Sequence, residues 1–87
     1  FKDINPIAKV HVLGIPKSEC VDFFDFISKN KPTTISEFFK KTNLVIDKLG
    51  ITKGGYKIIS NSGINGGQEV PHFHIHILGG QKVNLSV

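Results

Sequence analysis

The chain has 87 residues, of which 39% are hydrophobic, and its formal net charge is +4 with every basic residue a lysine. This length predicts one small globular domain over residues 1–87, close to the lower limit for a self-sufficient core. The lysines are dispersed and not interleaved with aromatic residues, which argues against nucleic acid and favours a nucleotide-sized anion as partner. The apolar runs are too short to cross a membrane, so no membrane partner is expected.

The cysteine content indicates the compartment. A single cysteine, Cys20, excludes an internal disulfide, and no secretory signal is visible at the start. A lone cysteine is typically a half-buried thiol in a reducing environment rather than a nucleophile. We therefore expect a cytoplasmic protein.

Residues 9–15 are predicted to form the first strand. Val10 and Val12 alternate with His11 and Leu13, which is the period of two that strands follow. Taken alone, His11 is interpreted as an ordinary surface or hydrogen-bonded histidine.

One long helix is predicted in the middle of the chain. Residues 17–31 are rich in phenylalanine but lack a clean period, and we expect a loop with a short helical turn there. Thr34 and Glu37 fit a capping box, which predicts a helix that starts at Thr34. Apolar residues then recur at three- and four-residue spacings, and Gly50 supplies a left-handed stop.

A second strand is predicted over residues 55–61, followed by a glycine-rich connection, 62–69. Asn65-Gly66 within it is typical of a simple turn. Glycines also allow backbone N–H groups to converge into an anion-binding nest, and the position before the next segment favours that use.

Three histidines alternate with apolar residues in the segment 70–80. A strand would place His72, His74 and His76 on one face, about 6.6 Å apart along the chain, too far for direct contact but close enough to line one small ligand. The opposite, apolar face would join the core. It carries Phe73, Ile75 and Ile77.

Such a row of imidazoles fits two kinds of chemistry. A neutral imidazole is a nucleophile at pH 7 and would attack phosphorus to give a phosphoramidate intermediate, with neighbouring imidazoles donating to the phosphate oxygens. Two histidines at i and i+2 also bind zinc, although only Glu69 and Asp3 offer themselves as a carboxylate third ligand. We rank phosphate chemistry first, a metal site second, and a chance arrangement on a solvated face last.

The segment His-Phe-His-Ile-His-Ile-Leu resembles the pattern His-φ-His-φ-His-φ-φ, with φ apolar, of the histidine triad (HIT) superfamily. Leu78-Gly79-Gly80 is similar to its Hint branch, the purine nucleoside phosphoramidases. The resemblance implies an α+β fold, a mainly antiparallel sheet with one long capped helix packed on it. It also implies a homodimer, and a chain that lacks the family's N-terminal helix and hairpin.

The resemblance assigns catalytic roles to four histidines. His74 would be the nucleophile that becomes transiently nucleotidylated. His72 and His76 would face the α-phosphate, with His11 as a supporting fourth histidine.

The resemblance also implies a nucleoside site. Phe1, Ile4 and Leu13 would form apolar walls for a purine base. Asp3 would accept hydrogen bonds from the two ribose hydroxyls, a role suited to a carboxylate.

The phosphate site implied by the resemblance lies beside the glycine-rich loop. Asn61, Gly67 and Gln68 would line it. Many relatives have Ser or Thr where this chain has Glu69, whose carboxylate should repel phosphate.

The implied activity is hydrolysis of P–N, or related P–O, bonds in purine nucleoside phosphoramidates, with a purine nucleoside monophosphate also bound. No cofactor is required, and zinc is possible but not favoured. Three alternatives stay open: a dinucleoside polyphosphate hydrolase, a zinc-dependent hydrolase, and a non-catalytic nucleotide-binding interaction module.

Overall fold

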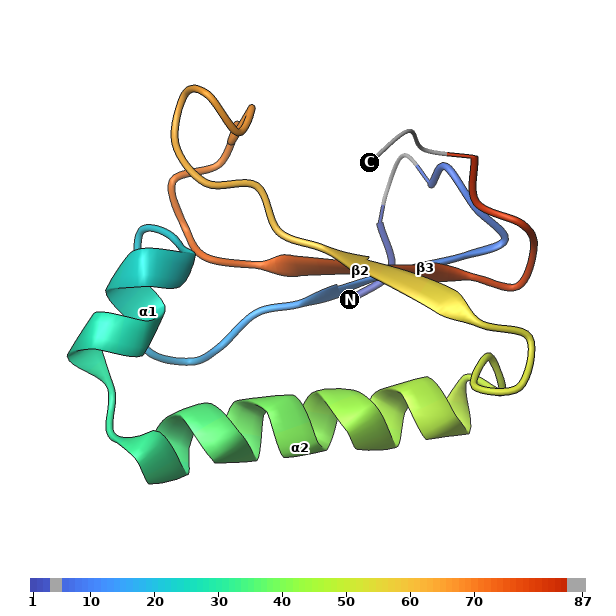
Figure 1. Ribbon diagram of the computed structural model, residues 1–87, viewed down its shortest axis with the longest axis horizontal. Helices are drawn as coiled ribbons and strands as arrows, with labels where there is room; N and C mark the ends of the chain where they lie inside the picture. Colours follow the sequence, from blue (N-terminus) through green and yellow to red (C-terminus); the bar gives the residue numbers. More distant parts are fainter. Residues whose placement is uncertain (4–5, 85–87) are drawn as a thin grey trace.

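A three-stranded antiparallel sheet with one long helix on it forms the framework of the protein, which confirms the expected α+β class (Figure 1). The computed structural model describes residues 1–3 and 6–84. The strand order is β1-β3-β2, so the histidine strand is central. The elements in chain order are β1 (Val10–Gly14), α1 (Phe23–Lys29), α2 (Pro32–Lys48), β2 (Tyr56–Ile59) and β3 (Ile75–Gly79).

The central strand β3 is shorter than predicted. Its ladder ends where its neighbours end: Gly14 of β1 pairs with Ile75, and Ile59 of β2 pairs with His76. His72 and His74 therefore precede the strand, and the expectation that all three histidines share one strand face is wrong. The segment before β3 is held by other bonds, because the Phe73 N–H donates to a loop carbonyl at 2.7 Å.

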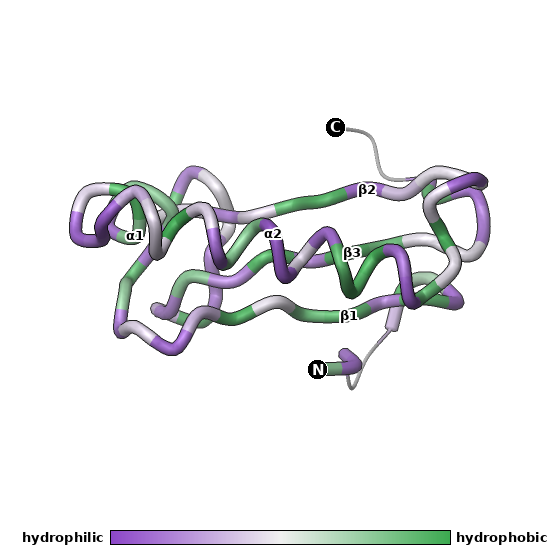
Figure 2. The backbone as a smooth tube through the Cα atoms, turned by 90° about the horizontal axis from the view of Figure 1, so that it is seen from below, coloured by the Kyte–Doolittle hydropathy of each residue, from purple (hydrophilic) through white to green (hydrophobic). Residues whose placement is uncertain are grey.

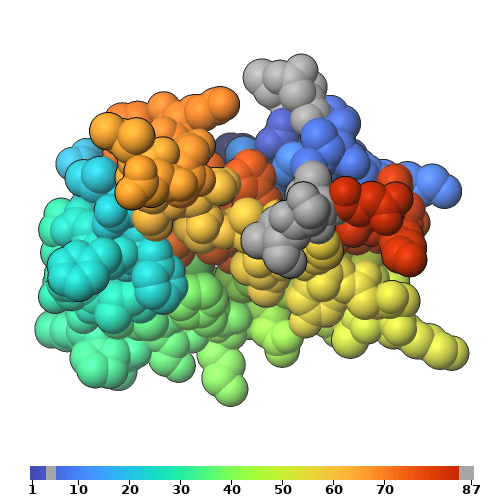
Figure 3. Space-filling model, turned by 45° about the horizontal axis from the view of Figure 1, so that its top comes forward, coloured from blue at the N-terminus to red at the C-terminus, as the bar shows by residue number. Residues whose placement is uncertain are grey.

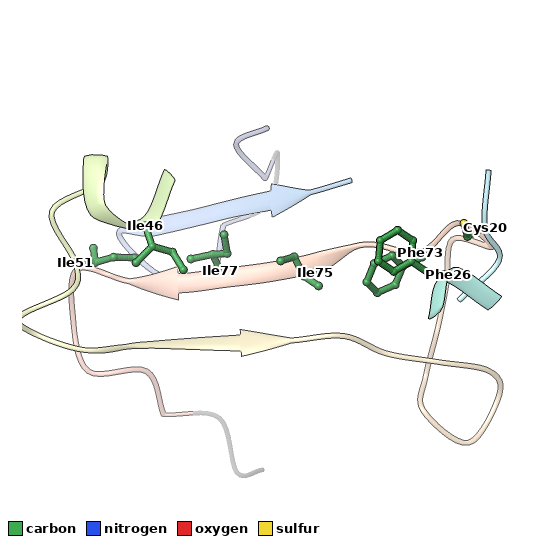
Figure 4. Packing of buried hydrophobic residues seen from close by; sticks show 7 residues of the cluster. All are labelled: Cys20, Phe26, Ile46, Ile51, Phe73, Ile75 and Ile77. Carbon is green, nitrogen blue, oxygen red and sulfur yellow. The ribbon is translucent and has the colours of Figure 1, made fainter. Parts of the chain in front are cut away.

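The core lies between the sheet and α2. Figure 4 shows the buried side chains in a row along β3, with Phe26 of α1 stacked on Phe73 at a ring-centroid distance of 4.8 Å. The predicted apolar face is confirmed, since its three members are at most 2% exposed. Cys20 is buried, not half-buried. The cluster comprises Cys20, Phe26, Ile46, Ile51, Phe73, Ile75 and Ile77.

Helix α1 takes up seven residues of the segment 17–31, where a loop with only a short helical turn was expected. Asp22 is its N-cap, and its Oδ1 accepts from the Asp25 N–H at 2.9 Å. Asp25 returns the interaction, because its Oδ2 accepts from the Val21 N–H at 2.8 Å. The two aspartates thus satisfy free amide groups at the helix start. These bonds begin the helix that carries Phe26 into the core.

Helix α2 begins at Pro32, two residues before the predicted start, and its N-cap Lys31 makes no side-chain cap bond. The predicted capping box of Thr34 and Glu37 is therefore wrong. Proline at the first helical position has the required φ and no N–H to satisfy, so no such box is needed. The predicted end is confirmed, because Gly50 has φ of 71°.

The two faces of the sheet are covered differently. Figure 2 shows α2 running along the strands on one face, with apolar residues recurring along helix and strands. The connection between β2 and β3 rises on the opposite side (Figure 1), and the N-terminal residues lie along the edge of the sheet beside β1, where Lys2 forms a bridge with Val12. Among the described residues, neither helix has the length and continuous apolar surface needed to span a bilayer.

Candidate active site

A cavity of about 450 Å³ brings most of the predicted site residues together. Figure 3 shows this side of the molecule hollowed between the loop of residues 60–70 (orange) and the N-terminal residues (blue). Its volume lies within the usual range for small-ligand sites. The lining residues are Asp3, Leu13, Asn61, Gly67, Gln68, Glu69, Val70, His74 and His76.

The ring of His74 is oriented by the backbone. Its Nδ1 lies 2.8 Å from the carbonyl oxygen of His72. A carbonyl only accepts, so Nδ1 carries the proton, and Nε2 of the neutral ring holds the lone pair. His74 therefore offers the cavity a nucleophilic nitrogen in a fixed tautomer.

His76 is held in the complementary tautomer through His11. The Ile7 N–H donates to His11 Nδ1 at 3.2 Å, which leaves the His11 proton on Nε2. That Nε2 lies 2.9 Å from His76 Nδ1. His76 accordingly accepts at Nδ1 and carries its own proton on Nε2. His76 thus acts as a hydrogen-bond donor beside His74.

Asp3 and His11 form a pair behind His76. His11 is 7% exposed and does not line the cavity, whereas Asp3 does. Asp3 Oδ2 lies 3.3 Å from His11 Nε2, and the Asp3 backbone N–H donates to the His11 carbonyl at 2.9 Å. These contacts tie the N-terminal segment to β1. His11 therefore supports the site through His76.

Burial lowers the pKa of His76 below its ordinary value of 6.5. The charges of His74 and His11 lower this pKa further, while Asp3 acts in the opposite direction. His76 is therefore neutral at neutral pH, as its tautomer in the hydrogen-bond chain requires.

The position of His72 differs from the prediction. Its ring is not among the groups lining the cavity, and the residue acts on His74 through its carbonyl. The rings of His74 and His76 lie 5.1 Å apart in an edge-to-face arrangement, so the expectation of no direct contact is wrong. Side chains outside a regular ladder are free to lean together, which the strand spacing does not describe.

The side chain of Gln68 holds the loop in place. Its Oε1 accepts from the Gly63 N–H at 2.9 Å, and its Nε2 donates to the carbonyls of Val21 at 2.6 Å and Val70 at 2.9 Å. Both amide hydrogens are thereby used. Gln68 lines the cavity as a structural residue, a role that the sequence pattern did not indicate.

The glycine-rich loop is built mainly as a turn. The N–H of Gly67 donates to a carbonyl inside the loop at 3.1 Å, and that of Gln68 donates to Gly63 at 3.0 Å. These two N–H groups and that of Gly63 are used in hydrogen bonds within the loop, so they do not form the predicted anion-binding nest. Gly66 is required by packing, since a Cβ there would lie 2.3 Å from the Ser62 carbonyl oxygen.

The expected nucleoside-binding residues are only partly brought together. Leu13 and Asn61 line the cavity. Phe1 is 80% exposed and lines a neighbouring groove, in which Leu13 also takes part. Ile4 lies outside the described residues.

One cluster in the site has the residue types of a metal site, and it consists of Asp3, His11 and His76. Their ligand atoms all lie within 4.8 Å of one another. Two nitrogens bound to one tetrahedral zinc at the usual Zn–N length would be about 3.3 Å apart. The 2.9 Å between His11 Nε2 and His76 Nδ1 fits a hydrogen bond instead. The donor set as arranged is therefore better suited to a proton-ordered pair.

Comparison with known proteins identifies the family. The family model described as HIT domain matches residues 1–83. An uncharacterized HIT-like protein of Rickettsia prowazekii is 48% identical over 83 residues, covering 95% of this chain and 69% of that protein. The purine nucleoside phosphoramidase of Escherichia coli strain K12 is 33% identical, with the same coverage.

A solved structure agrees with these matches. The HIT family hydrolase from Clostridium thermocellum is 37% identical, with a TM-score of 0.79 over 99% of this chain and 74% of that one. The fold is therefore shared with this HIT family hydrolase. The chain belongs to the HIT domain family.

Proposed function

We propose that this protein is a nucleotide-binding hydrolase that cleaves the P–N bond of purine nucleoside phosphoramidates through a nucleotidyl-histidine at His74. The observation that carries the proposal is the Nδ1 bond of His74 to the His72 carbonyl, which leaves the Nε2 lone pair in a cavity of nucleotide size. The likeness to the Escherichia coli phosphoramidase supports the substrate class.

In the first step, the Nε2 lone pair of His74 forms a bond to the α-phosphorus. The P–N bond of the substrate breaks, its electron pair stays on the amine nitrogen, and the amine takes a proton from water, while the neutral ring of His76 donates its Nε2 proton as a hydrogen bond to a phosphate oxygen. The tautomer enforced by His11 places that proton on the correct nitrogen. Water then attacks the phosphorus, the bond to His74 breaks with its electron pair returning to Nε2, and the proton lost by the attacking water passes to solvent.

The remaining cavity residues are proposed to bind the nucleotide. Asp3 accepts hydrogen bonds from the ribose hydroxyls, Leu13 contacts the base, and Asn61 contacts the phosphate. Each lines the cavity. The roles need no metal, and we propose that the enzyme works in the cytoplasm without one.

The decisive experiment compares His74→Ala with His72→Ala on an adenosine phosphoramidate. His74→Ala should abolish turnover while AMP still binds, whereas His72→Ala should lose much less because the backbone carbonyl remains. Rapid alkaline quenching of the wild type should yield a nucleotidyl adduct on the peptide that holds His74.

Four outcomes would contradict the proposal. A fully active His74→Ala variant would exclude the nucleophile. AMP binding without turnover or adduct would indicate an interaction module. Activity lost on chelation and restored by zinc would indicate a metal hydrolase, and faster turnover of diadenosine polyphosphate would favour that substrate class instead.

We also propose a homodimer formed along β2. This strand lies at an edge of the sheet, and Tyr56 and Ile58 on it are 38% and 48% exposed. An apolar edge strand is a ready surface for pairing. Sedimentation should give a dimer for the wild type and a smaller species for Ile58→Lys, and a monomeric wild type would refute this assembly.

A further inference from the structure

The cavity is acidic in a protein whose net charge is positive. Its lining includes the carboxylates of Asp3 and Glu69, and none of the chain's 11 lysines takes part. The low pKa of His76 means that this ring adds no compensating positive charge at neutral pH. An anionic nucleotide alone does not account for such a site.

The two carboxylates differ in their surroundings. Asp3 contacts His11 at 3.3 Å. Glu69 forms no hydrogen bond or ion pair within residues 1–3 and 6–84, and its side chain is exposed at the cavity. It follows Gln68, whose three bonds fix that part of the loop. Glu69 is therefore an unpartnered negative charge on a fixed wall.

The two carboxylates lie on different walls of the cavity, so they would face different parts of a bound substrate. Asp3 belongs to the N-terminal segment beside β1, and Glu69 to the connection between β2 and β3 (Figure 3). If the nucleoside lies against Asp3 and Leu13, with phosphorus at His74, the group released from phosphorus lies on the loop side. A carboxylate there attracts a cation and repels an anion.

We propose that Glu69 selects the leaving group by its charge, favouring phosphoramidates whose amine portion carries a second, positively charged group and disfavouring polyphosphate leaving groups. This inference rests on the proposed P–N hydrolysis. It also explains why a carboxylate lies beside a phosphate site. The amine released from a P–N bond is itself protonated in neutral water, so a carboxylate attracts it.

The test uses three adenosine phosphoramidates with amine chains of equal length that end in an ammonium, a hydroxyl or a carboxylate. For the wild type, kcat/KM should fall in that order. In Glu69→Gln, the ammonium substrate should lose about fivefold and the carboxylate substrate gain about fivefold, as for exposed charge pairs, with the change for the hydroxyl substrate between these two. Added salt should reduce the wild-type preference.

Glu19→Gln is the matched control, because Glu19 is exposed outside the cavity and its loss changes the net charge equally. It should keep the wild-type order. An unchanged order in Glu69→Gln, or the same change in both variants, would overturn the role of Glu69. If the wild type hydrolysed none of the three, the proposed function would fail. The order of their dissociation constants would then still decide the charge preference of Glu69.

Discussion

Replacing His11 tests whether the site depends on a hydrogen-bond chain behind the catalytic residues. In the wild type, His11 Nδ1 accepts from Ile7 and its Nε2 lies 2.9 Å from His76 Nδ1. His11→Ala removes both bonds and leaves the His76 tautomer unrestrained. We expect His76 to spend part of its time with the proton on Nδ1, where it does not serve the cavity.

The size of the effect follows from the bonds lost. One hydrogen bond contributes about 1 kcal/mol, or roughly fivefold in the tautomer ratio, so the loss of the productive tautomer should lower kcat/KM by up to about that factor. Misorientation of the ring would raise the loss toward about 100-fold. The Ile7 amide loses its partner as well, which should lower the free energy of unfolding by about 1–3 kcal/mol.

The assay combines phosphoramidate kinetics with an NMR titration of His76. Because the charge of His11 helps to lower the His76 pKa, that pKa should rise in His11→Ala. His11→Gln places an amide N–H near the original Nε2, so it should recover much of kcat/KM while the pKa stays raised. An unchanged kcat/KM in His11→Ala, or no recovery of kcat/KM in His11→Gln, would refute the role of this hydrogen-bond chain in catalysis.

Three further predictions concern the loop, the helix end and acid stability. Gln68→Leu should weaken AMP binding roughly tenfold by calorimetry, since three loop bonds are lost; unaltered binding would contradict the role given to its side chain. Gly50→Ala should cost about 1–2 kcal/mol in urea unfolding because its φ is 71°, whereas Gly54→Ala, in open space, should not; equal costs would count against the left-handed stop. The pKa of His76 in the folded state lies below 6.5, so between these two pKa values the unfolded state binds more protons at His76, and the free energy of unfolding falls as the pH drops below 6.5. His76→Asn should lose less stability on acidification. An identical pH dependence in the variant and the wild type would exclude His76 as a cause of the acid destabilisation.

Local patterns predicted the elements of the fold well where one feature dominated. The alternation of β1 and the glycine after α2 acted through neighbouring residues, and both are confirmed. The start of α2 was predicted two residues too late because Thr34 and Glu37 match a capping pattern, whereas the helix already begins at Pro32. The reciprocal bonds lie instead at Asp22 and Asp25, and their three-residue spacing was a signal for α1.

The site required information that no local pattern contains. Periodicity placed His74 and His76 together, but the end of the strand depends on where β1 and β2 stop pairing. The role of His11 follows from a contact across 65 residues, and that of Gln68 from one across 47. Residue type limits the possible roles, while these distant contacts choose among them. A histidine can donate, accept or attack, and here a carbonyl, a backbone amide and a second histidine decide which nitrogen does each.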